Sequence, residues 1–123
     1  MRRPAAIPGT ALLLLSVALF VTATGCAGVQ GLTVKVNNGD TKDKVVKLMG
    51  VPEDRQLKGE QEAWQYSSVV AMGICEYAVV WFDFGHVTGI NTYRNASIMG
   101  CRSGMRTVNW QEAPDRVIEY RRR

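Results

Sequence analysis

The segment from Cys75 to Phe84 constrains the fold most strongly, because it is almost continuously apolar and rich in Tyr, Val, Trp and Phe. These residue types favour a β-strand, and such apolarity is typical of a central strand covered on one face and partly shielded on the other. Asp83 to His86, around Gly85, predicts a turn, and Val87 to Tyr93 is expected to return as an antiparallel partner. The pattern therefore predicts an antiparallel sheet.

A short amphipathic helix is predicted directly after Gly39. Asp40 or Thr41 can cap its N-terminus, and Pro52 prevents its continuation. Its apolar stripe, at the spacing i, i+3 and i+4, consists of Val45, Leu48 and Met49. Further along the chain, the alternation of Trp64 and Tyr66 predicts a strand on which this helix packs.

The N-terminal segment has the pattern of a secretory signal. Arg2 and Arg3 form a short basic region, and an apolar stretch runs from Ala11 to Ala23. The alternative is an uncleaved membrane anchor. A membrane-spanning helix needs about 20 apolar residues, and this stretch is shorter than that.

The sequence Ala23-Thr24-Gly25-Cys26 resembles the bacterial lipobox. The resemblance implies a lipoprotein signal peptide at residues 1–25, and a lipidated Cys26 that begins a tether over residues 26–36. Ala27, rather than Asp, follows the cysteine, which implies sorting to the outer membrane with the domain on the periplasmic face. The alternative is an ordinary Ala-x-Ala-type cleavage that releases a soluble protein.

Export also bears on the other two cysteines. If Cys26 carries lipid, Cys75 and Cys101 remain as a pair that an oxidising periplasm would join. The alternative is two separate buried thiols. Removal of the signal leaves a net charge near neutral and a basic tail at residues 121–123, without the clustered basic face of a nucleic-acid-binding protein.

Three motifs occur in the order and spacing of a known family. They are NGDTKDKV from Asn38, LMGVP from Leu48 and Trp64-Gln65-Tyr66, and FDFGHVTGI from Phe82 is similar to the same family's closing hairpin. Over residues 37 to 93 the chain resembles the BamE-like SmpA/OmlA family of outer-membrane lipoproteins. The family fold implied is a pair of helices against a three-stranded antiparallel sheet.

We therefore expect an α+β fold, with one or two short helices packed on a three- to four-stranded antiparallel sheet. The family-like domain is assigned to residues 37–94, and residues 95–123 are expected to form an extension packed on it. Gly31 to Val36 looks extended rather than helical. In the extension, Thr107 to Trp110 is expected to be a strand that adds to a sheet edge or covers one, and Pro114 to Tyr120 a helical turn tied down by Val117 and Ile118.

Residues for catalysis or metal binding are scarce. His86 is the only histidine and falls at a predicted turn, and a disulfide between Cys75 and Cys101 would remove both thiolate nucleophiles. We expect no catalytic residue, metal site, cofactor or small-molecule substrate.

The family resemblance implies a non-enzymatic lipoprotein that supports envelope or outer-membrane protein assembly through protein contacts. Its partners would be the membrane, through the lipid anchor, and the β-barrel assembly machinery. The alternative is an envelope lipoprotein that uses the same fold to bind or inhibit a periplasmic enzyme. Aromatic residues that lie on an outer face would be the partner anchors, whereas those on the inner face fill the core. The candidates are Trp64, Tyr66, Tyr93 and Trp110.

Overall fold

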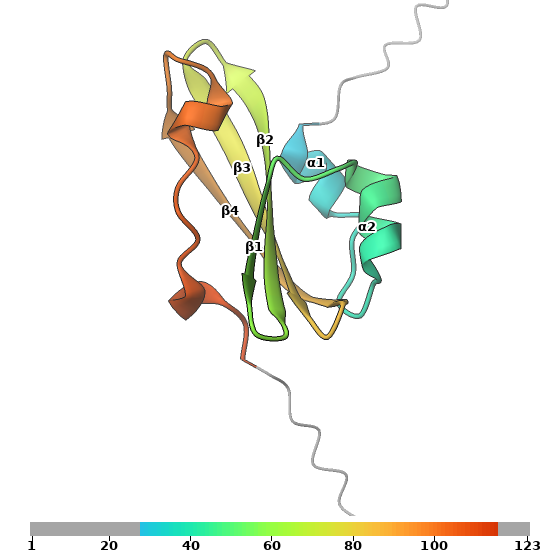
Figure 1. Ribbon diagram of the computed structural model, residues 1–123. Coiled ribbons are helices and arrows are strands. Elements are labelled where there is room, and N and C mark those ends of the chain that lie inside the picture. Colours follow the sequence, from blue (N-terminus) through green and yellow to red (C-terminus); the bar gives the residue numbers. More distant parts are fainter. Residues whose placement is uncertain (1–27, 116–123) are drawn as a thin grey trace, which may run out of the picture.

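A four-stranded antiparallel sheet organises the protein, whose computed structural model describes residues 28–115. The strands lie side by side in the order of the sequence, so each is joined to the next by a hairpin (Figure 1). They are β1 (Asp54–Lys58), β2 (Gln61–Ala71), β3 (Ile74–Asp83) and β4 (His86–Ala96).

The sheet lies between two different layers. Two short helices, α1 (Val29–Thr33) and α2 (Lys42–Met49), cover one face, and the chain that follows β4 crosses the other (Figure 1). The predicted α+β class is confirmed: the structure has two short helices on a four-stranded antiparallel sheet, within the expected range.

Strand β3 is the central strand that its apolarity predicts. Successive side chains point to opposite faces of a sheet. Ala78, Val80 and Phe82 accordingly belong to a core cluster beneath the helices. Val79 and Trp81 belong to a second cluster beneath the C-terminal segment. Both faces of β3 are therefore covered, which is more than the partial shielding expected on the second face.

Helix α2 has the predicted position and caps. The Thr41 hydroxyl accepts a hydrogen bond from the Lys44 backbone N–H at 3.3 Å, which satisfies one free donor of the first turn. Gly50 ends the helix with a positive φ of 83°, a conformation that glycine adopts without steric cost. Val45, from the predicted stripe, is completely buried against the sheet.

Helix α1 is a correction to the sequence analysis, because it forms within the segment expected to be an extended tether. Its first free backbone donors are satisfied by the sheet. Val29 N–H donates to Ser68 Oγ at 3.0 Å, and Gln30 N–H donates to Glu76 Oε2 at 3.3 Å. Val29 and Val36 are buried in the helix-side cluster. Contacts distant in sequence thus stabilise a helix whose local sequence, with Gly31, has low helix propensity.

The segment after β4 also corrects a prediction. Residues 107–109 are irregular rather than a strand, and a 3-10 turn, η3 (Trp110–Glu112), follows. The segment crosses the sheet face and does not extend an edge. Val108 is buried there, and the Trp110 ring packs edge-on against Trp81 at 5.6 Å between centroids. The predicted turn up to Tyr120, with Val117 and Ile118, lies almost wholly outside the described residues.

A disulfide ties this segment to the central strand. Cys75 in β3 is bonded to Cys101, which begins the 3-10 turn η2 (Cys101–Gly104), and their Cα atoms lie 5.4 Å apart. Two residues further along β3, the Tyr77 hydroxyl donates a hydrogen bond to the Cys101 carbonyl at 2.5 Å. The predicted pairing is therefore present, and it holds the start of the face-crossing segment in place.

Removing the disulfide should destabilise the domain. Cys75 and Cys101 are 26 residues apart, and opening a loop of that size costs about 3 kcal/mol in free energy of unfolding. The double variant Cys75→Ser/Cys101→Ser is expected to lose this amount in urea denaturation at pH 7. Cys26→Ser is the matched control and should unfold like the wild type. An unchanged urea midpoint in the double variant would contradict the prediction.

Candidate functional site

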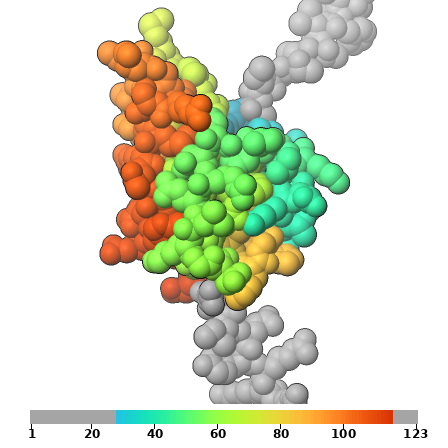
Figure 2. Space-filling view, in the orientation of Figure 1, coloured from blue at the N-terminus to red at the C-terminus, as the bar shows by residue number. Residues whose placement is uncertain are grey.

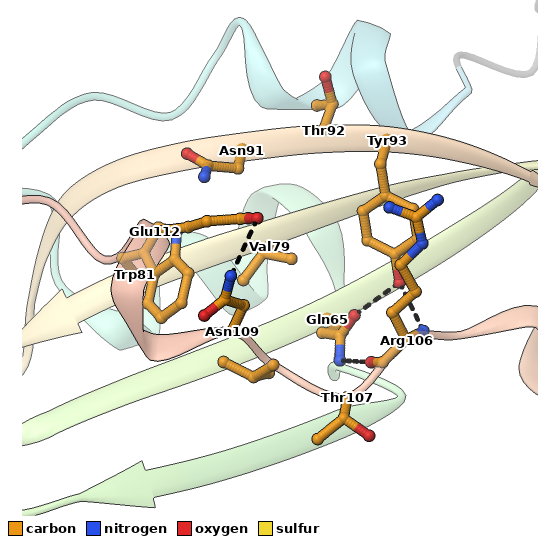
Figure 3. Close-up of a pocket in the computed structure, with 11 residues that line it drawn as sticks. Gln65, Val79, Trp81, Asn91, Thr92, Tyr93, Arg106, Thr107, Asn109 and Glu112 are labelled. Carbon is orange, nitrogen blue, oxygen red and sulfur yellow. Dashed lines mark hydrogen bonds between the residues drawn. The ribbon is translucent and has the colours of Figure 1, made fainter.

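A groove of about 350 Å³ lies between the sheet and the segment that crosses it (Figure 3). Strands β2, β3 and β4 form its floor, and residues 106–112 form its wall. We call residues 105–115 the strap. The polar or aromatic lining side chains used below are Gln65, Trp81, Asn91, Tyr93, Arg106, Asn109 and Glu112.

A closed set of hydrogen bonds joins the strap to the floor of the groove. The Tyr93 hydroxyl donates to Gln65 Oε1 and accepts from the Arg106 backbone N–H, both at 2.9 Å. Gln65 Nε2 donates to the Arg106 carbonyl, also at 2.9 Å (Figure 3). Gln65 thus satisfies both ends of its buried amide, and the strap is held at one defined height above β2 and β4.

Tyr93 is the centre of this arrangement. Burial raises the pKa of its hydroxyl above the usual 10, although the hydrogen bond from the Arg106 N–H acts in the opposite direction. The hydroxyl therefore stays protonated at neutral pH and can donate to Gln65. The Arg106 guanidinium lies 4.9 Å from the centre of the Tyr93 ring, in cation–π geometry, and the Tyr77 ring stacks beside Tyr93 at 4.6 Å.

Trp81 provides a donor within the groove. Its side chain is only 2% exposed, and its indole N–H has no hydrogen-bond partner among the described residues. A buried donor without a partner is costly, so an acceptor placed next to the indole N–H would stabilise it. Asn109 and Glu112 flank it on the strap, with the amide donating to the carboxylate at 3.4 Å (Figure 3). The groove therefore suits a neutral polar group such as a peptide carbonyl.

A second polar cluster lies on the helix side of the sheet, around the buried carboxylate of Glu62. It accepts hydrogen bonds from Arg55 Nε at 2.8 Å and from the Trp64 indole N–H at 2.7 Å. Its other oxygen forms an ion pair with Lys42 at the start of α2. One carboxylate thus connects β1, β2 and α2.

The charge state of Glu62 follows from these contacts. Burial alone would raise the pKa of its carboxyl, but hydrogen bonds from Lys42, Trp64 and Arg55 outweigh burial and lower the pKa below its usual 4.5. Glu62 is therefore ionised in the folded protein at neutral pH. Because it already has three partners, we assign it a structural rather than a binding role.

The structure separates the four predicted partner-binding aromatics. Trp64 and Tyr66 are buried under the helices, so their prediction as surface anchors is wrong: their face of β2 is the core face. Tyr93 lines the groove. Trp110 packs over Trp81 at the edge of the second cluster and stays half-buried. Cys26, the predicted lipidation site, lies outside the described residues.

Of the residues that line the groove, sequence reasoning singled out only Tyr93 as a partner-binding candidate, and the groove itself was missed. Gln65 stands between two core aromatics, and its polarity could have indicated that the opposite face of β2 is also buried. Arg106 has no local signal, since its role depends on the strap crossing Tyr93.

The other residues considered for chemistry lie apart from the groove. His86 is exposed at the start of β4, with Nδ1 3.0 Å from the Phe84 carbonyl. Within residues 28–115, no three His, Cys, Asp or Glu side chains are grouped as a metal site would require. Over the same residues, the helices are too short and too polar to cross a bilayer.

Comparison with known proteins identifies no relative, since no protein-family model, curated protein or solved structure matches the chain.

Tyr93→Phe should loosen the strap, because it removes the hydroxyl shared by Gln65 and Arg106. We expect a loss of about 1–2 kcal/mol in free energy of unfolding, since a buried amide oxygen is left without its donor. The Arg106 amide should also exchange with deuterium faster. Thr92→Val, at the neighbouring position of β4, where the exposed side chain points away from the groove (Figure 3), is the control and should change neither quantity. Unaltered exchange at Arg106 in Tyr93→Phe would count against this arrangement.

Glu62→Gln should destabilise the protein in a pH-dependent manner. At pH 7 we expect a loss of about 2 kcal/mol, because the ion pairs with Lys42 and Arg55 disappear. A lowered pKa in the folded state means that the carboxylate stabilises folding above pH 4.5 and that this contribution is lost as the pH falls further. The difference between variant and wild type should therefore shrink in acid. Glu60→Gln, at an exposed position, is the control, and a pH-independent difference for Glu62→Gln would refute the account.

Proposed function

We propose that this chain is a non-enzymatic outer-membrane lipoprotein of the SmpA/OmlA type, which supports envelope assembly through protein contacts. The resemblance rests on four short motifs, and the observation that carries the proposal is that these motifs contact one another. The Tyr66 hydroxyl, from the Trp-x-Tyr motif, donates to the carbonyl of Gly50 in the helix-ending motif at 3.0 Å. The spacing that defines the resemblance therefore corresponds to a packing unit.

The remaining two motifs are joined in the same way. Gly39 N–H donates to the Val87 carbonyl at 2.7 Å, and Val87 N–H donates to the Asp40 carbonyl at 2.9 Å. These bonds link the turn before α2 to the β3–β4 hairpin. A chance match of scattered motifs would not be expected to place each motif against another.

Two features support export and anchoring. The disulfide between Cys75 and Cys101 is of a kind that persists in the periplasm and is rare in the cytosol. Helix α1 begins at Val29, only three residues after Cys26, so a lipid on that cysteine would hold the domain close to the membrane.

The described surface suits binding rather than catalysis. The cysteines of the domain are bonded to each other, so neither supplies a thiolate. The groove beneath the strap offers the indole donor of Trp81 and the amide groups of Asn91 and Asn109. Such groups recognise a polar chain segment, which fits a protein partner.

Lipidation is tested by metabolic labelling with a palmitate analogue. The wild type should be labelled and recovered in the outer-membrane fraction, whereas Cys26→Ser should lose the label and accumulate as precursor. The Cys75→Ser/Cys101→Ser variant retains Cys26 and is the control that should keep the label. Equal labelling of wild type and Cys26→Ser would sink this part of the proposal.

Partner identity is tested by co-purification from solubilised membranes. An assembly factor should bring down the β-barrel insertion machinery in stoichiometric amounts. Recovery of one soluble periplasmic enzyme instead would overturn the assembly role and favour an inhibitor or binding lipoprotein.

A further inference from the structure

Exposed apolar side chains gather at one end of the sheet. Six of the eleven large apolar side chains exposed among the described residues lie there. Met72 is 100% exposed, Ile98 94% and Met99 82%. Figure 2 shows this end, in yellow-green and orange, projecting beyond the body of the molecule. We call it the apolar tip; it consists of Val69, Val70, Met72 and Ile74 of the β2–β3 hairpin, and Ile98 and Met99 of the loop after β4.

The two loops of the apolar tip are held together. Ser97 N–H donates to the Gly73 carbonyl at 2.8 Å, which joins the loop after β4 to the hairpin turn. The disulfide from Cys75 to Cys101 fixes the same two segments immediately below. Within its loop, Ser97 Oγ also donates to the Gly100 carbonyl at 2.6 Å. The apolar side chains are therefore presented on a braced platform.

The apolar tip lies at the end of the sheet where the chain enters the domain. The first backbone N–H groups of helix α1 donate hydrogen bonds to the side chains of Ser68 and Glu76. These two residues are paired across β2 and β3. The hairpin continues three residues past Ser68, which is about 10 Å of strand. From Cys26 to Gly28 the chain can reach at most about 7 Å. A lipid on Cys26 would thus lie close to the level of the apolar tip.

Charge at this end favours a membrane surface. The segments 67–75 and 95–105 contain no acidic residue, and Arg102 in η2 is exposed. An exposed arginine beside apolar side chains suits the boundary between anionic headgroups and acyl chains.

We infer that the apolar tip inserts into the lipid surface and forms a second membrane contact beside the lipid anchor. The inference rests on the proposed function for the position of the lipid. An anchor of such short reach brings Met72 and Met99 to the bilayer, and their apolar side chains gain by leaving water. Insertion at two points would fix the orientation of the domain, with the β3–β4 turn pointing away from the membrane.

Methionine oxidation on a membrane-coupled chain tests this directly. The mature chain from Cys26 is coupled through that thiol to a maleimide lipid in vesicles of phosphatidylethanolamine and phosphatidylglycerol, since Cys75 and Cys101 are already bonded. Hydrogen peroxide is added outside, and sulfoxide is measured by mass spectrometry. Met72 and Met99 should oxidise at least fivefold more slowly than in the uncoupled chain in solution. Met49 in α2 is the internal reference and should oxidise equally in both.

Two variants of equal charge separate insertion from general crowding at the surface. Met72→Asp places a carboxylate in the apolar tip, so Met99 should return to its rate in solution. Leu57→Asp adds the same charge to β1 at a position that is 68% exposed, and Met99 should stay protected. Oxidation of Met99 at the solution rate in the coupled wild type, or protection that persists in Met72→Asp, would overturn the inference. In this experiment the lipid is attached to Cys26 chemically. If the protein carried no lipid in cells, the proposed function would be refuted, but the methionine oxidation measured on vesicles would not change.

Discussion

Burial of β3 on both faces is the constraint on which the rest of the structure depends. A strand with Val79 and Trp81 on one side and Val80 and Phe82 on the other needs two covering layers. The helices provide one layer in the manner expected of a small α+β domain. The second layer has no regular secondary structure beyond short 3-10 turns, so it must be fixed by specific contacts. The disulfide at Cys101 and the hydrogen bonds at Tyr93 are these contacts.

The two layers that cover β3 differ in their relation to the proposed function. The motifs that resemble the SmpA/OmlA family lie in and around α2 and in the strands of the sheet, and contacts between them accompany their spacing. The second layer lies outside the resemblance and creates both the groove beneath the strap and, with the β2–β3 hairpin, the apolar tip. We therefore propose that the features particular to this chain lie on the layer that the family-like motifs do not form.

The features that depend on neighbouring residues in the sequence were predicted correctly. The β-propensity of β3, the Thr41 cap and the Gly50 end of α2 are decided by neighbouring residues, and the structure has each of them. Helix α1 was missed because its first donors are satisfied by Ser68 and Glu76, far away in sequence. The short polar strand β1 was also not anticipated, since it has no apolar alternation and depends on pairing with β2.

The burial of individual aromatic residues could also not be predicted from the sequence. The alternation of β2 correctly placed Trp64 and Tyr66 on one face, but a sequence does not reveal which face is covered. Within the strap, Thr107 to Trp110 was predicted to be a strand. Its actual path follows from packing of Val108 and Trp110 over Trp81, which is a tertiary effect.

The central claim, that the C-terminal segment is an integral layer over β3, is tested most directly by nuclear Overhauser contacts in solution. The account predicts cross-peaks between the indole protons of Trp81 and Trp110, whose ring centres lie 5.6 Å apart. It also predicts cross-peaks between the Gly89 α-protons and the Pro114 ring, which are in close contact. Random-coil shifts for Trp110, with both sets of cross-peaks absent, would contradict it.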